Sequence, residues 1–108
     1  MDVSLKDLKE LLCCQPATSA SHPYNIGSDY FIRTVTHHYT GKLIAVYPQE
    51  LVLLDAAWIA DDGRFSDAVS RGLFNEIEPW PENVEVVIGR NTIIDASIVA
   101  FPLPRSRK

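Results

Sequence analysis

Four leucines near the N-terminus recur at helical spacing after Ser4. They are Leu5, Leu8, Leu11 and Leu12. Apolar residues three and four positions apart share one face of a helix, and Ser4 with Asp7 resembles a capping box. The pattern predicts a short amphipathic helix within residues 1–14, which would cover one end of a barrel or one face of a sheet.

The middle of the chain is rich in β-branched and aromatic residues instead. Three runs with this composition predict a three-strand antiparallel meander over residues 28–58. These runs are Tyr30–Tyr39, Lys42–Tyr47 and Leu51–Trp58, with Gly41 as a turn or bulge and Pro48-Gln49-Glu50 as a hairpin connection. In Leu51–Leu54 successive residues are all apolar, so we expect both faces of this strand to be buried against other elements. Either the N-terminal helix or a second subunit would cover the second face.

The pattern changes again after Asp61. Apolar residues at helical spacing predict a short helix over Arg64–Arg71, capped by Asp62 and stopped by Gly72. Within the segment 62–83, Pro79-Trp80-Pro81 indicates a rigid loop, since proline cannot donate to a strand ladder.

Two further runs, Val84–Ile88 and Thr92–Phe101, predict a closing hairpin over residues 84–101 that turns at Gly89-Arg90-Asn91. Residues 102–108 form a short basic tail after the sheet. The length allows one domain over residues 1–108 with one modest core. We therefore expect a mainly β (α+β) protein. The order of elements resembles the small five-stranded antiparallel SH3-like and Sm-like barrels, with an N-terminal helix and a short helical insertion.

A second resemblance rests on short sequence segments. Arg33–Lys42 (RTVTHHYTGK) and Leu54–Ile59 (LDAAWI), followed by Asp62–Phe65 (DGRF), resemble a family of small proteins encoded by bacteriophages and prophages. The match covers about the middle third of the chain. It implies a setting, a virus growing in a bacterium, and it implies no mechanism.

Composition and charge narrow the choice of partners. The formal net charge is −4, whereas proteins that coat nucleic acid carry an excess of Lys and Arg. The two cysteines, Cys13 and Cys14, are adjacent, which predicts reduced thiols in a cytoplasmic protein. No run of residues has the length of an apolar membrane span, so we expect no membrane partner. If the chain is viral, the compartment is the host cytoplasm.

Candidate binding residues cluster in the predicted meander. On a continuous strand, Arg33, His37 and Tyr39 would share one face, and the meander could bring Trp58 to the same sheet. Arginine offers a planar fork for phosphate or carboxylate, and aromatic rings offer stacking faces for a base. The predicted ligand-binding residues are Arg33, Thr36, His37, Tyr39, Trp58 and Arg64. The structural alternative is that Tyr39 and Trp58 pack in a core or an interface while Arg33 pairs with an acid.

Other kinds of chemistry have less support. His37 and His38 would point to opposite faces of a strand, and no further ligands have convincing spacing, so we predict no metal site and no cofactor. Asp55, Asp61 and Asp62 accompany no known catalytic motif, so no catalytic residue is predicted. Asp95, inside an apolar strand, would pair with an arginine such as Arg90 or serve in binding.

The leading functional hypothesis is a non-enzymatic, homo-oligomeric binding protein of phage or prophage origin. It would sequester a small anionic signalling molecule of nucleotide type from a host defence pathway. Arg33 or Arg64 would hold phosphate, Tyr39 or Trp58 would stack on the base, and Thr36 or His37 would add hydrogen bonds. The alternatives are a Sm-like binder of single-stranded nucleic acid, a protein-interaction or virion accessory module, and an enzyme acting on a nucleotide.

Overall fold

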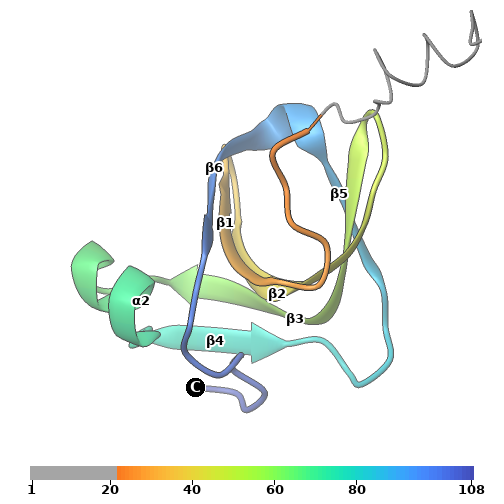
Figure 1. Cartoon of the computed structure of the whole chain (residues 1–108). Coiled ribbons are helices and arrows are strands. Elements are labelled where there is room, and N and C mark those ends of the chain that lie inside the picture. The colour runs from red at the N-terminus through yellow and green to blue at the C-terminus, as the bar shows by residue number, and fades with distance from the viewer. Residues whose placement is uncertain (1–21) are drawn as a thin grey trace, which may run out of the picture.

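A computed structural model describes residues 22–108 of the chain. Figure 1 shows the described part as one strongly curved antiparallel sheet with a short helix to one side. The elements in order are β1 (Asp29–Thr34), β2 (His38–Val46), β3 (Glu50–Asp61), α2 (Phe65–Arg71), β4 (Glu76–Pro79), β5 (Val86–Gly89), the 3₁₀ helix η2 (Arg90–Thr92) and β6 (Ile93–Ile98). The expectation of a mainly β protein is confirmed.

The sheet is open and has six strands. Its order is β4-β3-β2-β1-β6, and β5 pairs with β3 beside β4. The first part of β3 pairs with β5 and its last part pairs with β4. The prediction of a closed, five-stranded SH3-like or Sm-like barrel is therefore wrong in strand number and in closure. The predicted closing hairpin is also wrong, because β5 pairs with β3 while β6 pairs with β1.

The β1–β2 connection explains why the predicted bounds of the first strand are wrong. Residues Tyr30–Tyr39 do not form one strand, because β1 ends at Thr34 and β2 begins at His38. The Thr34 hydroxyl donates a hydrogen bond to the His37 carbonyl at 2.6 Å and accepts one from the His37 amide at 2.9 Å. Local hydrogen bonds of this kind compete with a strand ladder. They close a tight turn, after which β2 runs antiparallel to β1.

The three-strand meander itself is confirmed. Gly41 lies inside β2, opposite a bulge where Asp55 and Ala56 of β3 face it. Asp55 has a positive φ of 53°, as bulges often require. Glycine fits at position 41 because an added Cβ would lie 3.1 Å from the side chain of Leu53. The bulge increases the bend of β3, the strand that pairs with β2, β4 and β5.

Hydrophobic side chains are buried on both faces of the sheet. Tyr30 and Ile32 of β1 belong to one cluster, which also includes Leu43, Leu51 and Leu53. Phe31 points the other way and belongs to a second cluster. That cluster includes Ala57, Ile59, Ala68, Phe74, Ile77 and Val99. Alternation along β1 thus supplies both clusters, and α2 packs over the second through Ala68.

The strand segment Leu51–Leu54 is largely buried within the described part of the chain. Leu51 and Leu53 lie in the first cluster, and Val52 is buried as well. The predicted N-terminal helix over residues 1–14, with Cys13 and Cys14, lies outside the described residues. Whether that helix or a second subunit covers this strand stays a prediction.

The helix α2 begins one residue after its expected start and ends at Arg71 as predicted. Gly72 follows with φ 69°, and its amide bonds to the Ala68 carbonyl, as expected for a glycine stop. Asp62 does not cap the helix, because the N-cap is Arg64 without a side-chain bond. Asp62 instead pairs with His38.

The segment after α2 was predicted to be a loop, and part of it is a strand. Residues 76–79 form β4 on β3, with Pro79 opposite Ala57. Proline is tolerated here because it lies at the end of an edge strand. The tail continues the pairing, since Ile77 and Lys108 exchange two backbone hydrogen bonds of 3.0 Å. Among residues 22–108, no helix has the length and apolarity to cross a bilayer.

Candidate functional site

Side chains from three neighbouring strands form a row across one face of the sheet. Tyr39 of β2 lies opposite Trp58 of β3, and Trp58 lies opposite Glu78 of β4. Directly opposed residues on antiparallel strands point to the same face. His37 precedes Tyr39 by two residues and Trp80 follows Glu78 by two, and both border the same cleft.

Neighbouring aromatic rings in this row contact one another. The His37 and Trp58 ring centroids lie 5.8 Å apart, with an interplanar angle of 63°. Tyr39 and Trp80 lie 5.9 Å apart at 32°, and His37 and Tyr39 lie 6.3 Å apart. Tyr39 and Trp80 are half-buried and pack against the first hydrophobic cluster. They form the floor of the cleft, while the exposed rings of His37 and Trp58 meet at an angle beside it.

We call this feature the aromatic cleft. Its volume is about 390 Å³, within the size range of small-molecule sites. It is lined by His37, Tyr39, Trp58, Glu78, Pro79, Trp80 and Pro81. Among these lining residues Glu78 is the one carboxylate, and none is Lys or Arg.

The C-terminal tail holds the floor of the aromatic cleft in place. Arg105 donates hydrogen bonds to the carbonyls of Ala56 (3.1 Å) and Trp80 (2.9 Å). The Trp80 amide itself donates to the Ala56 carbonyl at 2.9 Å. These bonds fix the backbone on both sides of the Trp80 ring. Arg105 of the basic tail is thus bound to the fold.

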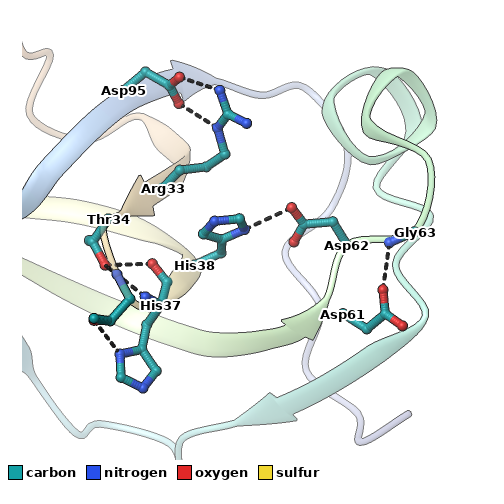
Figure 2. A network of polar contacts seen from close by, with 9 residues as sticks. Arg33, Thr34, His37, His38, Asp61, Asp62, Gly63 and Asp95 are labelled. Carbon is teal, nitrogen blue, oxygen red and sulfur yellow. Dashed lines mark hydrogen bonds and ion pairs between the residues drawn. The ribbon is translucent and has the colours of Figure 1, made fainter.

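Polar residues gather next to the aromatic cleft, at the turn before β2. His38 Nδ1 lies 2.7 Å from Asp62 Oδ2, and Thr36 Oγ1 lies 2.8 Å from His37 Nδ1. Figure 2 shows His37 and His38 pointing in different directions from this turn. The other carboxylate oxygen of Asp62 is buried and has no hydrogen-bond partner within residues 22–108. Among the described residues, no three His, Cys, Asp or Glu side chains converge as a metal cluster would.

Arg33 lies elsewhere, on the opposite face of the sheet. It alternates with Ile32 along β1, whereas the turn at Thr34 brings Tyr39 directly opposite Ile32. The shared face predicted for Arg33, His37 and Tyr39 is therefore wrong, because it assumed one continuous strand.

The Arg33 guanidinium is engaged on that opposite face. It binds both oxygens of Asp95, with Nε donating to Oδ1 at 2.9 Å (Figure 2). Its carbon centre also lies 4.6 Å from the ring centre of Phe65. The hydrogen bond from Arg33 lowers the pKa of Asp95, and the same bond raises the pKa of Arg33. Asp95 thus pairs with an arginine as expected, but the partner is Arg33 and not Arg90, which donates to the Tyr47 carbonyl.

The structure thus brings together part of the predicted site. His37, Tyr39 and Trp58 line the aromatic cleft, and Thr36 lies at its edge through His37. Arg33 does not line it, and Arg64 is exposed at the start of α2, outside the lining.

Sequence reasoning missed Glu78 and Trp80. Two prolines suggested a loop, although Ile77 between Glu76 and Glu78 shows the alternation of a short strand. A reading of that alternation would have placed Glu78 and Trp80 on one face.

Comparisons of this chain with protein-family models, with curated proteins and with solved structures gave no match.

Proposed function

We propose that this protein is a non-enzymatic binding protein that holds a small ligand of nucleotide type in the aromatic cleft. The observation that supports this most is the convergence of four aromatic rings from three separate segments: His37, Tyr39, Trp58 and Trp80. A base stacked on an aromatic side chain gains about 1–3 kcal/mol. An exposed row of rings on a rigid sheet is suited to such stacking.

The charges around the cleft suggest how the ligand is oriented. Glu78 would repel a phosphate inside the cleft, and no Lys or Arg among the lining residues would offset that repulsion. The base therefore enters the cleft, and the phosphate stays at its edge beside Thr36 and His37, both exposed polar residues. This arrangement replaces the role first given to Arg33, which is engaged by Asp95.

The proposal extends to assembly and setting. Several apolar side chains are more than half exposed among the described residues, and self-association would bury those that lie in its interface. They are Ile26, Val35, Tyr47, Val87, Ile94 and Ile98. In the setting that the phage and prophage resemblance implies, a homo-oligomer in the host cytoplasm would sequester a signalling nucleotide from a defence pathway.

The test is calorimetric titration of the protein with nucleosides and nucleotides, together with Trp58→Ala and Arg64→Ala. Stacking energies of about 1–3 kcal/mol correspond to roughly a 5- to 150-fold loss of affinity in Trp58→Ala. Arg64→Ala, a charged residue outside the cleft, is the control and keeps its affinity. The absence of both heat and thermal shift for every nucleotide class would rule out the proposal.

Mass spectrometry of the purified protein, first native and then denatured, gives the subunit number and any retained small molecule. A higher oligomer that releases a nucleotide supports sequestration. A monomer contradicts the oligomeric part of the proposal without affecting the binding part.

A protein-interaction module is the second candidate, and one feature favours it. Pro79 and Pro81 flank Trp80, and Glu78 lies beside them. Grooves lined by aromatic residues dock proline-rich segments, and an acidic residue would favour a basic one. Binding of a basic, proline-rich peptide together with no response to nucleotides would select this function. A single-stranded nucleic-acid binder has less support, since Arg105 is held by backbone carbonyls.

A further inference from the structure

Glu78 occupies a fixed place in the aromatic cleft. Its strand is paired on one side with β3, where Glu78 lies opposite Trp58. On the other side, the preceding residue Ile77 exchanges two backbone hydrogen bonds with Lys108. The backbone that carries Glu78 is therefore held from both sides, while its side chain is exposed and borders the cleft.

Nothing in the described part of the chain neutralises this carboxylate. The salt bridges found within residues 22–108 do not include Glu78. No Lys or Arg is among the residues that line the cleft with it. A carboxylate next to stacking rings can accept hydrogen bonds from the edge of a stacked base, and when ionised it can only accept.

The bases differ in what their pairing edges offer to such a group. Guanine presents two adjacent donors, the ring N1–H and the exocyclic amino group, which match the two oxygens of a carboxylate. Adenine and cytosine each present one amino group next to a ring nitrogen that carries a lone pair, and that lone pair would face the second carboxylate oxygen. Uracil presents one donor between two carbonyl groups. Of the four bases, guanine is thus the best match for Glu78.

We propose that Glu78 makes the aromatic cleft selective for guanine-type bases. This inference rests on the proposed function, since it names the ligand class of the same site. The base stacks against the rings of the aromatic cleft, those of Tyr39, Trp58 and Trp80, and its N1–H and amino group donate to Glu78. Glu78 is then a specificity-determining residue, and the rings supply the affinity that all bases share.

The experiment measures the dissociation constants of guanosine, inosine, adenosine and cytidine for the unaltered protein, for Glu78→Gln and for Glu76→Gln. Inosine keeps the N1–H of guanosine and lacks its amino group. Glu76→Gln makes the same charge change on the same strand, at an exposed residue outside the cleft. Nucleosides without phosphate keep charge repulsion out of the comparison.

Guanosine is expected to bind at least about tenfold more tightly than adenosine or cytidine, because a bidentate pair commonly gives that discrimination. Inosine falls between guanosine and the other nucleosides. In Glu78→Gln the preference for guanosine falls to within about threefold, since an amide can pair with adenine as well. Glu76→Gln keeps the full preference.

Two results overturn the inference alone. One is equal binding of all four nucleosides to the unaltered protein, and the other is a guanosine preference that survives Glu78→Gln. Either leaves the aromatic cleft as a binding site without base selectivity. If none of the nucleosides or the nucleotides binds, the proposed function fails and the inference fails with it.

Discussion

Thr34 shows how one side chain redirects a chain that otherwise has the composition of a continuous strand. Its hydroxyl bonds to the backbone of His37 as donor and as acceptor. Because of the resulting turn, Arg33 lies in β1 and Tyr39 lies in β2. Arg33 consequently points to the face where Asp95 lies, and Tyr39 to the face that carries the aromatic cleft.

The Arg33–Asp95 pair makes stability depend on pH in a predictable direction. Arg33 lowers the pKa of Asp95, so the folded state releases this proton more readily than the unfolded chain. The stabilisation is fully present above the unfolded-state pKa of about 3.9 and is lost as the pH falls through the lower folded-state pKa. Both side chains are partly exposed, which limits the effect to about 1 kcal/mol.

Asp95→Asn is therefore expected to lower the free energy of unfolding by about 1 kcal/mol at pH 7 and by much less near pH 3. Urea denaturation at the two pH values measures this difference. Asp67→Asn is the control, because its i,i+4 pair with Arg71 is longer, at 3.7 Å, and Arg71 is more exposed than Arg33. An Asp95→Asn effect of equal size at both pH values would contradict the prediction.

At the scale of the element, β4 marks the limit of what the sequence predicted. The meander and α2 follow from long runs of clear periodicity, so their existence was predictable. The strand β4 has four residues and ends in proline, and its pairing is decided by β3 and the tail rather than by its own composition. Glu78 and Trp80 were missed for that reason, whereas Tyr39 and Trp58 were identified on longer strands.

The end of α2 gives a prediction at the same scale. Gly72 has φ 69°, and a Cβ built there would lie 2.6 Å from the ring of Phe101. Gly72→Ala therefore combines a strained backbone with a clash and is expected to cost about 2–3 kcal/mol in free energy of unfolding, measured by urea denaturation.

Gly89→Ala is the matched control for Gly72→Ala. Gly89 has φ −70°, and an added Cβ would lie 3.5 Å from Asn91, an ordinary contact. This variant is expected to change stability by less than about 0.5 kcal/mol. Equal losses in the two variants would show that the left-handed conformation and the Phe101 ring do not determine the cost.

At the scale of the whole molecule, the tail links distant parts of the fold. Arg105 bonds to carbonyls of β3 and of the segment after β4. One of these carbonyls belongs to Trp80, whose ring forms part of the cleft floor. The positions of the side chains that form the cleft floor therefore depend on a residue far from them in the sequence. Sequence patterns could not predict this link, since it depends on where the tail lies in three dimensions.

Arg105→Ala is expected to loosen Trp80 and to lower stability by about 1 kcal/mol, since two charge-assisted but partly exposed hydrogen bonds are lost. In a Trp58→Phe background Trp80 is the remaining tryptophan, so its fluorescence reports the change as a shift to longer wavelength. The exposed Arg107, changed to alanine, is the control. An emission spectrum that Arg105→Ala leaves unchanged would contradict a positioning role.

The pairing of β1 with β6 also has a consequence for folding kinetics. Arg33 and Asp95, which face each other across these strands, are 62 residues apart in sequence. The β1–β2–β3 contacts span much shorter loops and can form early, whereas β6 must wait for a long loop to close. The Arg33–Asp95 pair then forms late. Mutations in it should raise the unfolding rate and leave the folding rate nearly unchanged.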